Sequence, residues 1–186
     1  MIFRKGGKLA ESERIKCNGK HLQTVNHFKY LGLTIQTTGK SFRIHLRSRM
    51  VAAVRAMNDV KDTKLTALGT AMQLYRLKVV PKLTYGIKLI WEYLICKQLL
   101  ELEKMKARYL KRVLGVSQHN WSRLVYELAK ETFFVEDLKT SLMLPTTTAY
   151  KDALRELNDK KMDIWEDFYT TEAMTNWKWT ETNYMS

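Results

Sequence analysis

The stretch FKYLGLTIQTTGKSFRIHLRSRMVAAVRAMNDV, residues 28–60, decides the fold because its pattern changes once, from strand to helix. Residues 28–35 are mostly apolar or aromatic, and they predict a strand that ends at Thr37-Thr38-Gly39. Ser41 is a residue type that caps helices. The stretch therefore predicts a β element followed at once by an amphipathic helix. Its apolar residues recur at helical spacing, namely Leu46, Met50, Ala53, Val54, Met57 and Val60.

The chain before this stretch also predicts β structure. The pair Asn18-Gly19 lies between the short alternating runs 14–17 and 20–25, and such a pair is typical of a hairpin because both residues tolerate positive φ. Residues 2–3 predict a further short strand, which a basic, glycine-rich loop follows over residues 4–8. These signals predict a small antiparallel β element.

The chain after this stretch predicts helices. Pro81 is expected to kink or restart the second of them, because proline has no backbone N–H to donate within a helix. The apolar residues 83–91 predict a buried continuation, and Gly115 is expected to end the third helix. Helical spacing of apolar residues predicts helices over residues 68–79, 97–114, 121–130 and 149–168.

These elements predict an α+β fold class, mostly α, with a small antiparallel hairpin or sheet at the N-terminus followed by a helical bundle. We expect three segments along the chain. The β element covers residues 1–39, the bundle covers residues 40–130, and a C-terminal helical extension with a frayed tail covers residues 131–186.

Charge is distributed unevenly along the 186 residues, whose net charge is +13. Residues 1–60 carry 12 Lys and Arg against 3 Asp and Glu, and residues 61–120 carry 12 against 4. Residues 121–186 carry 8 against 12 and are mildly acidic. Cations within amphipathic segments favour a polyanionic partner, most often nucleic acid. The alternative is a basic surface that only keeps the protein soluble.

Composition also bears on the compartment. Cys17 and Cys96 are far apart and in no metal-ligand spacing, which is typical of a reducing compartment. No window reaches the roughly 18 apolar residues of a membrane span, and the first residues lack the apolar stretch of a signal peptide. We therefore expect a soluble intracellular protein with no membrane partner, and the choice between nucleus and cytoplasm stays open.

The sequence offers no catalytic constellation. Its histidines, residues 21, 27, 45 and 119, form no HxxxH or HxxH pair, so each is expected at the surface or in a hydrogen bond. There is no Asp-Asp pair, whereas Mg²⁺-dependent phosphoryl transfer needs clustered carboxylates. We expect no metal, no cofactor and no enzymatic activity of the chain on its own.

Cations alternate with aromatic residues at two places, Phe28-Lys29-Tyr30 and Phe42-Arg43. Aromatic rings can stack on bases while Lys and Arg contact phosphates. The alternative is that these rings belong to the core and the cations only face water. The pattern by itself favours neither interpretation.

Four segments resemble the reverse transcriptases of non-LTR retrotransposons. FKYLG at residues 28–32 resembles their primer-grip motif, and residues 2–7 with the Asn18-Gly19 hairpin resemble the strands that lead into it. LY at residues 74–75, with VPKLTYG at residues 80–86 and then Trp91, is similar to a block of the thumb. Residues 102–116, LEKMKARYLKRVLGV, resemble a second thumb block, so the resemblance covers roughly residues 1–130.

The resemblance implies a truncated polymerase with a thumb-like bundle. The family's catalytic aspartates, in its F/Y-A-D-D motif, would precede Met1, so we expect a remnant, domesticated or decaying, that cannot extend a primer. A thumb holds a template–primer duplex and a primer grip positions the primer end. Neither task requires a metal or a titrating acid.

Charge and resemblance together predict a non-catalytic protein that binds RNA, DNA or a hybrid. The alternative is a structural or protein-interaction domain that forms a homo-oligomer or binds a protein partner through an exposed apolar face. Arg43, Arg47 and Arg55 lie off the apolar stripe, and their spacings of four and eight residues place them roughly on a line that suits a phosphate backbone. The predicted nucleic-acid contacts are Lys29, Tyr30, Gly32, Lys40, Arg43, Arg47 and Arg55.

Overall fold

The structure of the protein is a computed structural model that describes residues 15–22, 25–36, 42–60 and 67–170, with side chains up to residue 159. The expectations for residues 2–8, for residues 37–39 and for Ser41 lie outside this part of the chain.

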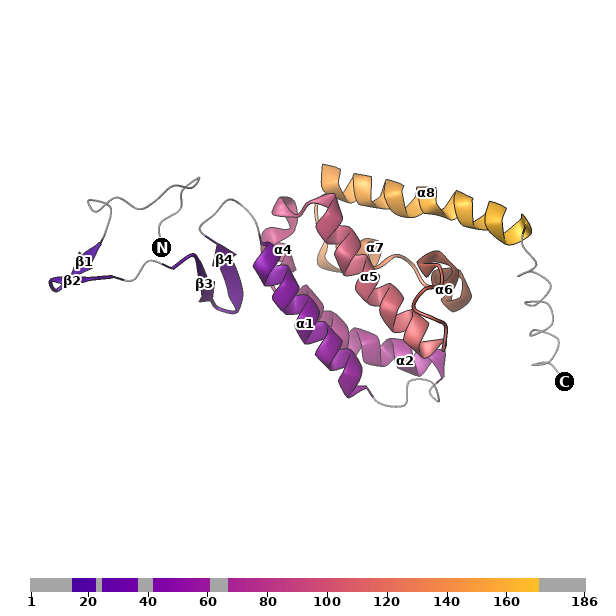
Figure 1. Cartoon of the computed structure of the whole chain (residues 1–186), viewed down its shortest axis with the longest axis horizontal. Helices are drawn as coiled ribbons and strands as arrows, with labels where there is room; N and C mark the ends of the chain where they lie inside the picture. Colours follow the sequence, from indigo (N-terminus) through magenta and orange to yellow (C-terminus); the bar gives the residue numbers. More distant parts are fainter. Residues whose placement is uncertain (1–14, 23–24, 37–41, 61–66, 171–186) are drawn as a thin grey trace.

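Two small antiparallel sheets precede a helical body, which confirms the predicted α+β, mostly α fold. The strands are β1 (Lys16–Cys17), β2 (Lys20–His21), β3 (His27–Tyr30) and β4 (Leu33–Gln36). The helical elements are α1 (Arg43–Asp59), α2 (Leu68–Leu74), the π-helical turn η2 (Tyr75–Val79), α3 (Val80–Thr84), α4 (Ile87–Ile90), the 3₁₀ turn η3 (Trp91–Tyr93), α5 (Cys96–Val113), α6 (Ser122–Ala129), α7 (Phe134–Leu142) and α8 (Thr148–Thr170). The strands lie at one end of the molecule, α1 and α5 run side by side, and α8 crosses one side (Figure 1).

The predicted hairpin at Asn18-Gly19 is present, with β1 and β2 as its strands. The single strand predicted over residues 28–35 is wrong, because this segment forms a second hairpin. Its turn consists of Leu31 at φ 45° and Gly32 at φ 82°, and Tyr30 pairs with Leu33 across it. A two-residue hairpin turn of type I′ needs positive φ at both positions. Leucine rarely adopts that conformation, so the apolar run gave no sign of a turn.

The helices lie close to their predicted positions, with two differences. The expected kink or restart near Pro81 takes the form of η2, a π-helical turn that joins α2 to α3 without a gap, and Pro81 is the second residue of α3. The first difference is that Gly86, whose φ is 77°, divides the apolar run over residues 83–91 between α3 and α4. The second difference is α7, which was not predicted at all.

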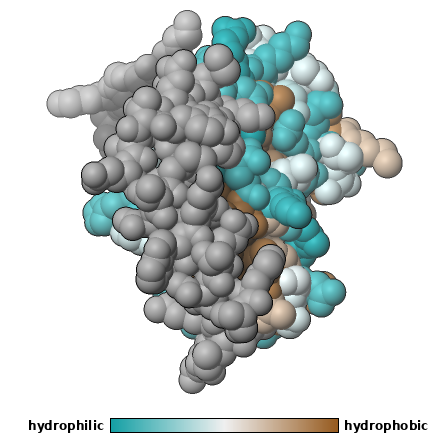
Figure 2. All heavy atoms as spheres, turned by 90° about the vertical axis from the view of Figure 1, so that its right-hand side faces the viewer, coloured by the Kyte–Doolittle hydropathy of each residue, from teal (hydrophilic) through white to brown (hydrophobic). Residues whose placement is uncertain are grey.

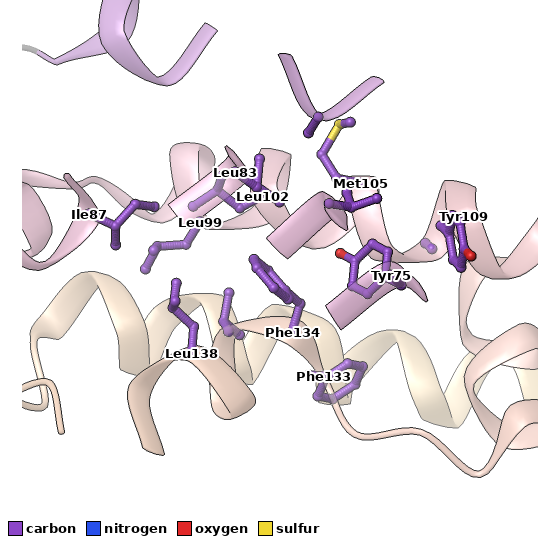
Figure 3. Close-up of a cluster of buried hydrophobic side chains, with 14 of the residues drawn as sticks. Tyr75, Leu83, Ile87, Leu99, Leu102, Met105, Tyr109, Phe133, Phe134 and Leu138 are labelled. Carbon is purple, nitrogen blue, oxygen red and sulfur yellow. The ribbon is translucent and has the colours of Figure 1, made fainter. Parts of the chain in front are cut away.

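One hydrophobic core joins the helices from α1 to α8. Figure 3 shows side chains from α5 meeting side chains from η2, α3, α4 and α7, with the ring of Phe134 near that of Tyr75. The rings of Tyr75 and Tyr109 lie 4.8 Å apart between centroids. Residues of the expected second and third segments therefore share this core.

The face of the molecule in Figure 2 carries both hydrophilic and hydrophobic residues. Figure 2 views the molecule from the end where α8 finishes, and there hydrophilic residues border a narrow hydrophobic strip. Among the described helices, none combines the length and the apolar character that crossing a membrane requires.

Candidate nucleic-acid interface

The helices α1 and α5 lie side by side and run in the same direction (Figure 1). Arg112, in the last turn of α5, fixes their relative position at one end. Its guanidinium donates hydrogen bonds to the backbone oxygens of Met57 and Val60, at 2.8 and 3.2 Å. These carbonyls belong to the end of α1, where they lack partners within the helix. The two helices are thus held in register by a cation that caps one helix from the other.

A groove of about 880 Å³ runs along this pair of helices. We call it the α1–α5 groove. From α1 it receives the three arginines that the sequence predicted as phosphate contacts, all of them exposed. From α5 it receives two further cations and one carboxylate, and the remaining lining residues are apolar. Its lining is Arg43, Arg47, Met50, Val51, Val54, Arg55, Glu101, Lys104, Met105 and Arg108.

Helix geometry explains why these cations line the same groove. Residues four and eight apart lie on the same face of a helix, so Arg47 and Arg55 point to one side of α1. The core face of α1, with Leu46, Ala53 and Met57, is turned away from that line. Lys104 and Arg108 are four apart on α5, and they lie off its buried stripe in the same way. The same spacing argument that found the arginines would have found these two residues, but only the structure shows which helix faces α1.

The groove continues toward the end of α5. A second hollow of about 570 Å³ shares Val54 and Arg108 with the first and extends to Gly115. Lys111 lines it as a largely buried residue whose Nζ donates to the Gln118 backbone oxygen at 3.0 Å. Burial lowers the pKa of Lys111. Basic side chains therefore line the α1–α5 groove and the second hollow together.

The predicted hairpin contacts lie elsewhere. Lys29 and Tyr30 are exposed on β3, and Lys40 lies outside the described residues. Gly32 has a conformational role: besides its positive φ, a Cβ there would stand 2.7 Å from a ring carbon of Tyr85. The Tyr85 hydroxyl donates to the backbone oxygen of Leu31 at 2.6 Å, which holds the turn against the helices.

His45 joins this hairpin to the helical body from the opposite side of α1. Its Nδ1 accepts a hydrogen bond from the backbone N–H of Thr34 at 3.3 Å, and its Nε2 lies 2.9 Å from the Tyr85 backbone oxygen. An N–H can only donate, so Nδ1 carries no proton and Nε2–H is the donor to Tyr85. Burial lowers the pKa of His45, the Tyr85 carbonyl opposes this, and the charge of Arg49 adds to it. If Nδ1 of His45 were protonated, its N–H and the backbone N–H of Thr34 would both be donors pointing at each other, and this hydrogen bond would be lost.

The hydrogen bonds of neutral His45 predict that the free energy of unfolding falls as the pH drops below about 6.5. In the unfolded chain His45 takes up a proton near its ordinary pKa. The folded chain keeps it neutral to lower pH, so the unfolded state binds more protons in this window and is favoured by acid. Urea unfolding at about pH 7.5 and about pH 5.5 measures the effect.

The matched control is His45→Gln, which can still donate and accept but does not titrate. We expect a smaller difference in unfolding free energy between the two pH values for this variant than for the parent. Equal pH dependence in both proteins would show that His45 does not cause it.

Within the described residues, no three His, Cys, Asp or Glu side chains lie together in a way that could hold a metal ion. Two buried charged residues of α5, Glu103 and Lys106, have partners near α6 and α7. Glu103 on α5 accepts hydrogen bonds from the start of α7, and Lys106 on α5 lies 2.8 Å from carboxylate oxygens of Glu131 and Asp137. These groups organise the packing of α6 and α7 on α5.

Comparisons with known proteins give no match: no protein-family model, no curated protein and no solved structure is significantly similar to this chain. The resemblance to reverse transcriptases therefore stays a prediction, and the function has to be argued from the groove.

Proposed function

We propose that this protein binds nucleic acid, with a phosphate backbone seated in the α1–α5 groove. The observation that carries the proposal is the meeting of five cations with a single carboxylate along one groove, from two helices that the sequence places about fifty residues apart. Three of these cations, Arg43, Arg47 and Arg55, are those for which the sequence predicted phosphate contacts. The resemblance to a thumb, which holds a duplex on a helical scaffold, points to the same task.

The architecture of the groove suits a polyanion. The cations lie on two long helices that the shared core and the Arg112 cap hold in place, so the protein backbone loses little conformational entropy when a phosphate backbone binds. Each phosphate contact releases condensed counterions, which makes the affinity dependent on salt. The apolar floor, including Met50 and Val54, lies below the cations and can contact sugars.

The test is the triple substitution of Arg43, Arg47 and Arg55 to Gln, in a protein shown to stay folded by circular dichroism. Binding to labelled single-stranded DNA, duplex DNA and an RNA–DNA hybrid is measured by anisotropy at several salt concentrations. We expect the slope of log K against log salt to fall by about one for each lost contact, and affinity to fall at least about tenfold at low salt. The loss is expected for every sequence, because phosphates carry no sequence information.

The matched control removes three exposed cations that do not line the groove, Lys78, Lys82 and Lys151, all changed to Gln. The net charge then falls by the same amount. We expect affinity and slope to change much less than in the groove variant. If the two triple variants behave alike, binding follows overall charge and the groove is not the site.

A protein-interaction role is the second candidate, and one observation favours it. All four residues of β3 are exposed, and the described part of the chain supplies only β4 as a partner strand. A free strand edge can pair with another chain. Absence of any salt-dependent binding in the experiment above, together with self-association in sedimentation, would favour this role instead.

A further inference from the structure

We propose that the α1–α5 groove ends in a base-stacking site, in which Tyr93, supported by Phe42, holds an unpaired base of a single strand. The inference rests on the proposed function and specifies its ligand: a nucleic acid with a single-stranded segment, whose phosphates lie in the groove and whose next base leaves it at the start of α1 and α5.

The position of the two rings follows from the parallel helices. Phe42 immediately precedes α1, and Tyr93 lies three residues before α5. Because α1 and α5 run in the same direction, both residues lie near the start of the two helices, and Phe42 directly precedes Arg43, which lines the groove. Their ring centroids are 5.8 Å apart, with an angle of 48° between the ring planes. An aromatic pair thus stands where a strand that follows the arginines would emerge.

The two rings differ in exposure, and the difference suits a stacking site. Tyr93 is 47% exposed, whereas Phe42 is partly buried and packs against the core. The buried ring supports the exposed one, so Tyr93 is held in place before a ligand arrives, which lowers the entropy cost of binding. The tyrosines that serve the core alone, Tyr75 and Tyr109, are about 1% exposed or less.

The exposed ring of Tyr93 favours a single strand over a duplex. A base in a duplex has both faces covered by its neighbours, while an unpaired base offers a face that an aromatic ring can cover. Stacking on an aromatic side chain does not depend strongly on which base is present. The cations supply affinity for any backbone, and Tyr93 adds affinity only where a base is unpaired.

The experiment compares Tyr93→Leu, Tyr93→Phe and Tyr93→Trp with the parent, using a single-stranded oligonucleotide and a blunt duplex of the same length. We expect Tyr93→Leu to weaken single-strand binding by about fivefold or more, the effect of losing one stacked base. Duplex affinity should stay within about twofold, while the phenylalanine and tryptophan variants keep single-strand affinity because both rings can stack.

A second readout reports stacking directly. The fluorescent base 2-aminopurine is placed at successive positions of the single strand, and its emission is quenched where it stacks on a ring. We expect one position to be quenched by the parent and by Tyr93→Phe, and to recover its emission with Tyr93→Leu. Trp121→Leu is the matched control, because this exposed aromatic residue directly precedes α6. Helix α6 lies away from the start of α1 (Figure 1).

The outcomes separate this inference from the proposed function. If Tyr93→Leu weakens single strand and duplex equally, or neither, while the groove variant still loses its salt slope, the stacking site is refuted and the groove stands. If Trp121→Leu has the same effect as Tyr93→Leu, the site is also refuted. If the parent binds no nucleic acid at all, both proposals fail.

Discussion

Replacing Glu103 with leucine is expected to lower the free energy of unfolding by about 3–5 kcal/mol, the cost of leaving buried hydrogen-bond donors without their charged acceptor. Glu103 is 3% exposed and lies in the middle of α5. One of its carboxylate oxygens accepts from the Phe134 N–H at 2.9 Å and from the Tyr126 hydroxyl, and the other accepts from the Val135 N–H at 3.0 Å. Leucine fills the space but leaves the N–H groups of Phe134 and Val135 buried without acceptors, and the Tyr126 hydroxyl keeps only the Glu103 backbone oxygen at 3.4 Å. Each buried donor without an acceptor costs about 1–3 kcal/mol.

The two N–H groups are the first of α7, so Glu103 acts as the cap of a helix that lies thirty residues further along the chain. A negative charge also suits the positive end of the helix dipole. Burial raises the pKa of Glu103, and its hydrogen bonds from Tyr126, Phe134 and Val135 oppose that shift. We therefore expect the leucine variant to lose the packing of α7 first, seen as faster backbone hydrogen exchange in residues 134–142.

Urea unfolding measures the change, with two variants beside it. Glu103→Gln keeps one acceptor oxygen but points its amide NH₂ at a donor, so we expect a smaller loss. Glu101→Gln alters a partly exposed carboxylate two residues away in the groove, and we expect a change within about 0.5 kcal/mol. A leucine variant as stable as Glu101→Gln would show that the buried carboxylate does not hold α7.

Replacing Trp91 with alanine should also cost about 3–5 kcal/mol, as expected for a large core residue that leaves a cavity. Trp91 in η3 is 1% exposed, and its ring lies 6.1 Å from that of Tyr150 on α8. Its indole N–H donates to the backbone oxygen of Pro145 at 2.8 Å, just before α8 begins. One side chain thus fixes the segment that leads into α8 against the helices before α5.

Thermal or urea unfolding of Trp91→Ala and Trp91→Phe separates the two contributions. Phenylalanine restores part of the volume but not the donor, so we expect it to recover part of the lost stability. Trp121→Ala serves as the surface control, because this tryptophan is exposed, and we expect a change within about 0.5 kcal/mol. Equal losses for Trp91→Ala and Trp121→Ala would contradict the buried role of Trp91.

Patterns that lie within one element could be predicted from the sequence. The apolar stripe of α1 and the line of Arg43, Arg47 and Arg55 follow from helix periodicity, and that periodicity is local. The Asn18-Gly19 hairpin and the restart at Pro81 follow from the backbone preferences of single residues. Each of these features depends on neighbours within a few positions, which a sequence records directly.

The second hairpin and α7 could not be predicted, because tertiary contacts stabilise both. The turn at Leu31-Gly32 places a leucine at positive φ, and the hydroxyl of Tyr85, from the turn between α3 and α4, holds it. His45 of α1 accepts a hydrogen bond from Thr34 in the same hairpin. The first N–H groups of α7 are capped by Glu103 rather than by a residue just before the helix, so the usual local start signal is missing.

The groove combines both kinds of information. The sequence by itself determined that α1 carries a line of arginines off its apolar face and that the first two thirds of the chain are basic. Only the tertiary structure decided that Lys104 and Arg108 of α5 complete the groove, and that Tyr93 and Phe42 meet near the start of α1 and α5. The reason is physical: periodicity fixes the face of a helix on which a side chain lies, whereas packing of the whole core fixes what that face meets.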